Sequence, residues 1–428
     1  MSRNPFCLQT ASLAFLACWF LCIPAAHAED SLTQGERLFQ AGAFADAEAA
    51  YAETLRDDPR CAAAALRLGK IALLSNRLDA AEKFLKNALE LEADNRKAQG
   101  LLAETYHRLD RFDEAAPLYR ACDRAALADM YESFEGKKPY DLSASANYTE
   151  LEFVKTDPLP IVKARINGVR DVFLLIDTGA SELSIDRELA EELGVKCLGE
   201  TTATFAGGRQ ASVGHACIDS LQLGEFDIRN LPVSLMPLNK MSLPGMPKFE
   251  GIIGTVVFYH FITTLDYPAG KLKLRRITPA ALAELDEKAK SADPPPIPFW
   301  MAGDHFMVAW GRANQADPCL MLVDTGMAGG GFGCPESTLK AAGIELPEFS
   351  GEGIGGGGMV KITPITVREL SLGNYQQKNI RGFYGVFPKI SENGWGFPVG
   401  GIVSHLFFRP CAVTFDFTKM RLFLETPR

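Results

Sequence analysis

A segment that the chain carries twice, at a spacing of 150 residues, limits the possible folds more than any other feature. In each copy, a glycine-containing apolar run is followed by a phenylalanine, a Thr-x-Asp-aromatic stretch and two alternating leucines. The matched pairs are Gly251-Ile252-Ile253 with Gly401-Ile402-Val403, Phe258 with Phe408, Thr264-Leu265-Asp266-Tyr267 with Thr414-Phe415-Asp416-Phe417, and Leu272 and Leu274 with Leu422 and Leu424. Alternating apolar residues are typical of strands. The pattern therefore predicts a duplicated β domain.

Each copy also contains Asp-Thr-Gly directly after an apolar run. The triplets are Asp177-Thr178-Gly179 and Asp324-Thr325-Gly326, and they lie 147 residues apart, so a net length change of three residues separates the copies. Two carboxylates, each delivered by the end of a buried strand into a tight glycine turn, are what an enzyme needs if both must face one water molecule. One triplet is a weak signal, whereas two in matching contexts are a strong one.

Further signals surround the triplets. Asn167-Gly168 stands between two β-rich runs and predicts a hairpin that delivers Asp177 at its far end. Between triplet and closing motif, each copy has a glycine-rich tip, at 206–209 and at 355–358. A Leu-Gly turn follows each tip, at 223–224 and 372–373.

This order of elements, with Asp-Thr-Gly-Ala-Ser at 177–181 and Gly-Ile-Ile-Gly at 251–254, resembles an aspartic protease lobe of the retropepsin type. Two such lobes in one chain resemble the bilobal, pepsin-like arrangement. The resemblance implies an all-β bilobal fold with lobe 1 at 155–276, an inter-lobe segment at 277–297 and lobe 2 at 298–428. It implies an aspartic-type endopeptidase that acts on polypeptides without a cofactor or metal. Because one chain holds both lobes, we expect a monomer.

The resemblance also implies a role for each site residue. The two Asp carboxyls would share one proton and act as general acid and base around one water. The threonines would hydrogen-bond across the lobe interface, the triplet glycines would let the backbone approach and donate to the dyad, and the tips would be flaps over an extended substrate. The implied residues are Asp177 and Asp324 as catalytic, Thr178, Gly179, Thr325 and Gly326 as dyad-supporting, and Gly207, Gly208, Gly356 and Gly357 as substrate-binding flap tips.

Two positions depart from the family pattern. Met327 follows the second triplet, where the family usually has a small residue, and Ser404 stands in the place of Gly254. Neither lobe has a hydroxyl directly after its triplet glycine, so we expect a dyad pKa above that of pepsin and activity at mildly acid to neutral pH. If Met327 narrows the cleft, the lobes are instead a catalytically silent peptide-binding protein or a passenger on a repeat-based adaptor.

A period of 34 residues precedes the lobes. Small and large residues recur in step where two helices must pack closely, which resembles three tetratricopeptide repeats within residues 29–130. The columns are Gly35, Gly69 and Ala103, then Ala47, Ala81 and Ala115, then Tyr51, Leu85 and Tyr119. Asn76 and Asp110 replace the turn glycine Gly42. Such repeats bind peptides or partner proteins in a concave groove, and the alternative is a stabilising spacer without a ligand.

Two segments without a clear β pattern connect these parts. Residues 131–154 are polar and without helical or strand period, which predicts a linker. The inter-lobe segment contains a helical run near 280–290 and then three prolines at 294–296, a stiff spacer. The basic stretch 271–276 alternates charge with Leu and is interpreted as a strand with one solvated face.

The ends and composition of the 428-residue chain add constraints. Residues 1–28 have the layout of a secretory signal, with Arg3, an apolar core and the cleavage-site pattern Ala26-His27-Ala28. We therefore expect a periplasmic or secreted protein that begins near Glu29. The alternative is an uncleaved membrane anchor. A net charge of −9 argues against a nucleic-acid partner. Seven of ten cysteines lie beyond the signal, an odd number, and neither CxxC nor HExxH occurs, so we expect no metal.

Overall fold

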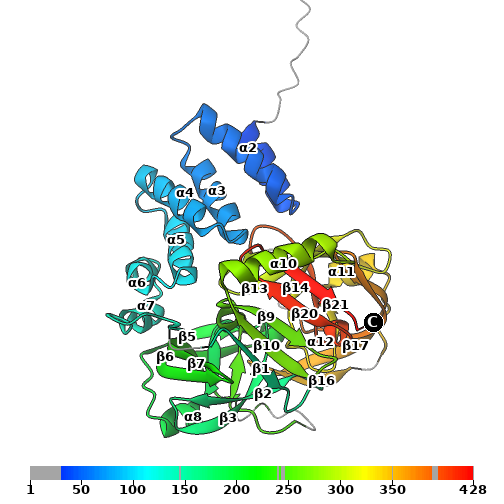
Figure 1. The fold of residues 1–428 in the computed structure, drawn as a ribbon. Coiled ribbons are helices and arrows are strands. Elements are labelled where there is room, and N and C mark those ends of the chain that lie inside the picture. The colour runs from blue at the N-terminus through cyan, green and yellow to red at the C-terminus, as the bar shows by residue number, and fades with distance from the viewer. Residues whose placement is uncertain are drawn as a thin grey trace, which may run out of the picture.

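The computed structural model describes residues 30–143, 146–238, 241, 246–348, 350–387 and 394–427. The predicted signal peptide at 1–28 lies outside the described residues. Figure 1 shows a helical array from the N-terminal part of the chain and a larger body built mainly of strands. The predicted fold class, an all-α repeat array followed by an all-β bilobal body, is confirmed.

The array consists of helix pairs that follow the 34-residue period. Its helices are α1 (Ser31–Gln40), α2 (Phe44–Asp57), α3 (Ala62–Leu74), α4 (Leu78–Leu91), α5 (Arg96–Arg108), α6 (Phe112–Ala121) and α7 (Ala125–Glu132). The small residues of the period face the large ones: a Cβ on Gly35 would lie 2.5 Å from the Tyr51 ring, and one on Gly69 would lie 2.6 Å from Leu85. Gly35 and Gly69 are therefore glycine because two helices touch there.

Lobe 1 is built on a seven-stranded sheet with the order β2-β3-β8-β4-β7-β6-β5. Its strands are β2 (Ile161–Ile166), β3 (Arg170–Ile176), β4 (Leu183–Asp186), β5 (Gly199–Thr204), β6 (Gln210–Leu223), β7 (Phe226–Met236) and β8 (Gly251–Ile253), with short helices α8 (Arg187–Glu192) and α9 (Thr255–Phe258). The predicted hairpin joins β2 to β3. Its turn residues Asn167 and Gly168 have φ of 51° and 68°, the left-handed conformation that a two-residue hairpin turn requires.

Lobe 2 repeats this plan in an eight-stranded sheet with the order β12-β13-β14-β19-β15-β18-β17-β16. The strands are β12 (Trp300–Ala302), β13 (Phe306–Ala313), β14 (Cys319–Val323), β15 (Phe332–Cys334), β16 (Gly351–Gly355), β17 (Gly358–Leu372), β18 (Tyr375–Tyr384) and β19 (Val399–Val403), with helices α11 (Glu336–Ala341) and α12 (His405–Phe408). The strand before each triplet pairs in parallel with the strand of the closing motif, β3 with β8 and β14 with β19.

A third sheet of six strands joins the lobes, in the order β1-β10-β9-β20-β21-β11. Its strands are β1 (Tyr148–Glu152), β9 (Phe261–Asp266), β10 (Lys271–Arg276), β11 (Ile297–Pro298), β20 (Ala412–Asp416) and β21 (Arg421–Glu425). At its centre β9 pairs antiparallel with β20, and Thr264 lies opposite Thr414, with 2.8 Å between their hydroxyl oxygens. The duplicated segments thus meet at equivalent residues, as expected for two copies related by a local two-fold axis.

The predicted linker at 131–154 is wrong in part, because its last residues form β1 and its first two end α7. Thr149 and Leu151 of β1 are buried and the intervening Glu150 accepts a hydrogen bond from Lys271 of β10 at 2.7 Å. Five largely polar residues carry too weak a local pattern to be recognised as a strand. Pairing with a strand more than a hundred residues later supplies the stability.

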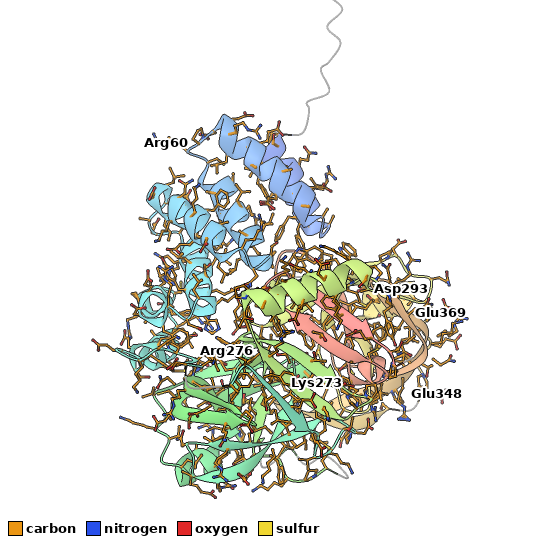
Figure 2. The ribbon with its side chains drawn as sticks, viewed as in Figure 1. Arg60, Lys273, Arg276, Asp293, Glu348 and Glu369 are labelled. Atoms are coloured by element: carbon orange, nitrogen blue, oxygen red, sulfur yellow. The ribbon has the colours of Figure 1, made fainter. Side chains whose placement is uncertain are left out.

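The inter-lobe segment packs on this sheet. Helix α10 (Pro279–Ser291) covers the predicted helical run, and its Ala281 and Leu285 pack with Ile262 and Phe423 of the sheet. The basic stretch is β10, as predicted, with Leu272 and Leu274 buried. Figure 2 shows its Lys273 and Arg276 together with Asp293 beyond the end of α10.

The array and the lobes share hydrophobic cores. Phe44 of α2 lies edge-on to Trp300 and Phe397 of lobe 2, with ring centroids 5.1 Å apart in both pairs. At the other end of the array, Ala126 of α7 is so close to Gly199 of β5 that a Cβ there would lie 2.7 Å away. Figure 1 shows α7 beside β5 and β6. The repeats therefore pack along the lobes instead of hanging from a free tether.

Two observations concern the described residues as a whole. No helix among them is long and apolar enough to cross a membrane. The seven cysteines among them are free thiols in this structure.

Candidate active site

Two buried strands deliver the two aspartates to one point. Leu175 and Ile176 of β3 pair with Ile252 and Ile253 of β8, and Leu322 and Val323 of β14 pair with Ile402 and Val403 of β19. The next backbone N–H in each lobe continues the ladder: Asp177 donates to Ile253 O at 3.1 Å, and Asp324 donates to Val403 O at 3.0 Å. Each triplet therefore begins where a fully buried, parallel strand pair ends, which fixes its backbone.

The two threonines lock the lobes to each other. The N–H of Thr178 donates to the Thr325 hydroxyl and the N–H of Thr325 donates to the Thr178 hydroxyl, both at 3.0 Å. The Thr178 hydroxyl donates in turn to Val323 O at 3.3 Å, and both threonines are buried. Because the two hydrogen bonds are equivalent, each lobe makes the same contact with the other at this point.

The triplet glycines bring the backbone against the carboxyls. Within each lobe, the glycine N–H donates to its own aspartate, Gly179 to Asp177 at 2.8 Å and Gly326 to Asp324 at 2.7 Å. Across the interface, a Cβ on Gly179 would lie 2.5 Å from the Asp324 carboxyl, and one on Gly326 would overlap the Asp177 carboxyl. Only glycine leaves room for both carboxyls between the lobes.

The two carboxyl groups hydrogen-bond to each other and are buried together. Burial raises the pKa of both groups, and the neighbouring charge of Asp324 raises that of Asp177 further, well above its ordinary value. Two carboxyls this close retain a shared proton over a pH range in which isolated carboxyls have lost theirs. One group is then an acid and the other a base.

Family comparisons agree with this geometry. Residues 162–257 match the aspartyl protease family model, and residues 32–90 and 72–126 match two tetratricopeptide repeat models. The chain therefore joins a segment that matches tetratricopeptide repeats to one that matches aspartyl proteases. The match to the aspartyl protease model lies in lobe 1. Lobe 2 is equivalent to lobe 1 in its strand pairs and in its Asp-Thr-Gly triplet. No match was found among curated proteins.

The two glycine-rich tips, one from each lobe, touch each other. The first comprises the 3-10 turn at Ala206–Gly208 between β5 and β6, and the second is the Gly356–Gly357 turn between β16 and β17. A Cβ on Gly207 would overlap Val360, and one on Gly356 would overlap the Phe205 ring. Phe205 itself packs in one apolar cluster with Ala180, directly after the first triplet, and Ala328, two residues after the second. One of the tips therefore packs on the same apolar cluster as the loops that follow the two triplets.

Gly208 differs from the other three tip glycines. Both φ angles of the first tip are positive, 68° at Gly207 and 74° at Gly208, but a Cβ on Gly208 would enter open space. Gly357 lies against Arg209, whose guanidinium Nε donates to Met359 O at 2.8 Å. Three of the four predicted flap residues, Gly207, Gly356 and Gly357, thus lie at one contact between the lobes. The role of all four toward substrate stays a prediction.

Met327 packs into its own lobe. A Cβ on Gly330 would lie 2.7 Å from the Met327 sulfur, and one on Gly333 would lie 3.2 Å from its terminal methyl. The side chain therefore folds over two glycines of the loop that follows the second triplet. Ser404 completes this arrangement because its hydroxyl accepts the Met327 N–H at 3.0 Å. The two departures from the family pattern contact each other.

Three polar residues near the dyad escape sequence reasoning. In the turn between β12 and β13, one Asp304 carboxylate oxygen accepts a hydrogen bond from the Ser181 hydroxyl at 2.8 Å, and the other lies 2.6 Å from His305 Nδ1. Burial disfavours a charged His305, but the Asp304 carboxylate beside it raises the His305 pKa above its ordinary value. The resulting positive charge acts on both dyad carboxyls and lowers their pKa. The sequence Gly-Asp-His alone does not indicate that this turn lies near the dyad.

Proposed function

We propose that the protein is an endopeptidase that hydrolyses peptide bonds with a water molecule activated between Asp177 and Asp324. The observation that carries the proposal is the mutual contact of the two carboxyls at the lobe interface, with each triplet glycine facing the opposite carboxyl. A pair that shares one proton can take a proton from water and give one to the scissile carbonyl, and the two groups then exchange roles.

The charge state of the pair sets the working pH of the proposed enzyme. Because the pKa of both carboxyls is raised, the shared proton persists to higher pH than on an isolated carboxyl. We expect activity at mildly acid to neutral pH. A profile of rate against pH that peaks below about pH 3 would contradict this inference.

The substrate of the proposed reaction is an extended polypeptide. Glycine-rich hairpins can pair with an extended backbone through main-chain hydrogen bonds and exclude water from the dyad. The tips touch each other in the structure, so they must separate to admit a chain. Because a single chain supplies both triplets, the proposal requires no second copy.

The decisive experiment uses the purified chain from Glu29 onward and a denatured protein without disulfides as substrate, over pH 3 to 8. We expect cleavage, and we expect Asp177→Asn and Asp324→Asn each to lower kcat by about 10³-fold or more, because each removes an acid or base group. Wild-type protein without activity over the whole range, or activity that persists in either variant, would overturn the proposal.

The repeats and the export signal complete the proposal. Tetratricopeptide repeats are protein-interaction modules, and we propose that the face of the array remote from the lobes recruits a partner or the substrate. Figure 2 shows Arg60 at the end of the array, directed away from the lobes. Export is tested separately by the N-terminal residue of protein recovered from the periplasm or medium, which we expect near Glu29; retention of residues 1–28 in a membrane fraction would support the anchor instead.

A further inference from the structure

The edge of the repeat array that contacts the protease is formed by equivalent turn residues. Gly42, Asn76 and Asp110 follow each other at 34-residue steps, and all three have positive φ, at 75°, 54° and 56°. Asn and Asp are the non-glycine residues that adopt this left-handed conformation most readily. The array therefore keeps its turns while two of the three carry polar side chains.

Each of these turns contacts a lobe. Gly42 lies against Trp310 and Leu320 of lobe 2. Asn76 donates to Phe417 O of lobe 2 at 3.0 Å and accepts a hydrogen bond from the Tyr259 hydroxyl of lobe 1 at 2.6 Å. The edge thus spans both lobes and lies across their junction.

The third turn adds an ionisable pair to this edge. The Asp110 carboxylate lies 3.1 Å from His260 Nε2 of lobe 1. His260 also stacks on Tyr140, with ring centroids 4.0 Å apart. Together the three turns place contacts on lobe 2, on both lobes and on lobe 1, in that order along the array.

Arg108 connects the array to the turn between β12 and β13. Its side chain, at the end of α5, is 2 % exposed, and it forms an ion pair with Glu104 of the same helix at 2.7 Å. One guanidinium nitrogen donates to Met301 O at 3.1 Å and to Gly303 O, and another donates to Leu73 O at 2.8 Å. Charge-assisted hydrogen bonds from a buried guanidinium are strong, and their removal leaves carbonyls without partners.

The carbonyls that Arg108 holds belong to the turn that touches the first triplet loop. Gly303 has a φ of 61° and begins the Gly303–His305 turn. The next residue, Asp304, accepts the hydrogen bond from Ser181, four residues after Asp177, and this bond joins lobe 2 to lobe 1. Two hydrogen bonds, joined through the covalent chain of Gly303 and Asp304, therefore connect the third repeat through lobe 2 to the loop that follows Asp177.

We propose that Arg108 of the third repeat is a positioning residue for the dyad, which holds the Gly303–His305 turn of lobe 2 on Ser181 of lobe 1 and so fixes the relation between the two triplets. The array is then a brace across the two lobes of its own protease. This inference rests on the proposed function, because it assigns the brace to the Asp177–Asp324 dyad.

The test measures kcat and KM of the full chain from Glu29 with the denatured protein substrate. Arg108→Met keeps an unbranched apolar stem and removes the donors. We expect kcat to fall about tenfold or more while KM stays within about threefold, because small displacements of catalytic groups slow the reaction more than they weaken binding. Arg67→Met is the matched control, since Arg67 pairs with Glu36 inside the array at 2.6 Å; we expect it to change kcat less than twofold.

A double variant separates positioning from general loss of stability. If Arg108 acts through Asp304, the losses in Arg108→Met and Asp304→Asn are not independent, and the double variant is more active than the product of the single losses predicts. Independent losses, or a fall in Tm for Arg108→Met with kcat equal to that of the control, would overturn the proposal.

Two further arms cover failures of folding and of the proposed function. If Arg108→Met does not fold, Asn76→Gly and Asp110→Gly keep the left-handed turn that Gly42 shows and remove the edge contacts; a combined loss of severalfold in kcat supports the brace, and unchanged kcat overturns it. If the wild-type chain cleaves nothing, hydrogen exchange still tests the brace. Faster exchange at 177–183 in Arg108→Met than in Arg67→Met supports it, and equal exchange rejects it.

Discussion

The two lobes have the same Asp-Thr-Gly residues at the dyad, but they differ in the residue that packs behind the loop after each triplet. In lobe 1, a short loop follows the triplet, and Gly254 lies so close to it that a Cβ would be 2.6 Å from the carbonyls of Ala180 and Glu182 and would overlap that of Ser181. In lobe 2, the loop is longer and glycine-rich, and the equivalent Ser404 is buried and accepts the Met327 N–H.

This difference shows which features a duplicated site must keep. The aspartate, threonine and glycine of each triplet contact the other lobe, so a change in one lobe disturbs both. The residue behind the loop contacts only its own lobe, where a longer loop makes room for a hydroxyl and a methionine. Shared geometry at the interface therefore coexists with different packing a few ångströms away.

The largest effect expected from a test of this comparison comes from the triplet glycines. Gly179→Ala and Gly326→Ala place a methyl group against the opposite carboxyl. Both variants should lose at least about 100-fold in kcat, because the added atoms push the carboxyls apart. Steady-state kinetics on the denatured substrate measures the loss. A Cβ on the helical residue Gly100 would make only an ordinary contact, 3.9 Å from the Cys122 sulfur, and Gly100→Ala should leave kcat unchanged. Activity within threefold of wild type in either triplet variant would show that the carboxyls are not held as described.

The second test exchanges the supporting residues. Gly254→Ser brings side-chain atoms into three backbone carbonyls and should destabilise the protein by about 2–3 kcal/mol, the usual range for overpacking of a rigid site. Ser404→Gly removes one hydrogen bond to Met327 and should cost about 1 kcal/mol. Urea unfolding of both variants gives the two values. Equal losses would mean that the loops are more adaptable than their packing indicates.

The third test asks whether the dyad destabilises the fold at neutral pH. The folded pKa of both carboxyls is raised, so the stability that protonation provides is present at acid pH and is lost as pH rises through the folded pKa. Asp177→Asn and Asp324→Asn should therefore unfold at a higher temperature than wild type at pH 7, by about 1–2 kcal/mol in stability, as for other replacements of strained active-site groups.

The same measurement at lower pH supplies the control. The advantage of either asparagine variant should shrink as pH falls toward the ordinary range of carboxyl pKa, about 4, because the carboxyls then begin to take up protons in the unfolded state as well as in the folded state. Calorimetry at pH 4 and pH 7 compares the three proteins. A constant difference at both pH values would show that the carboxyl pKa is not raised by folding.

The smallest effect is expected at Met327. Its side chain packs over Gly330 and Gly333 and is partly buried. Met327→Ala should lower stability by about 1 kcal/mol through lost apolar burial and should leave kcat within about threefold. Kinetics and thermal unfolding of one preparation test both points. A large gain in kcat would instead indicate that Met327 obstructs the cleft.

Much of the fold and of the central site follows from local spacing. Gly35 and Gly69 recur because each helix pair repeats one contact, and Asn167-Gly168 specifies its hairpin through the φ angles that it allows. The two triplets identify the aspartates because strand, turn and glycine lie next to each other in the chain. The strand at 148–152 was missed because five polar residues contain almost no pattern of their own.

The sequence by itself determined the repeat array, the duplicated lobes and the candidate dyad, since each is a short pattern repeated at a fixed period. Only the tertiary structure decided that the array lies across both lobes, that Arg108 reaches carbonyls 193 and 195 residues away, and that Asp304 meets Ser181 from the other lobe. It also decided that Met327 folds back into its own lobe. Contacts between single residues this far apart leave no period in the chain, because their energy depends on distance in space and not on separation in sequence.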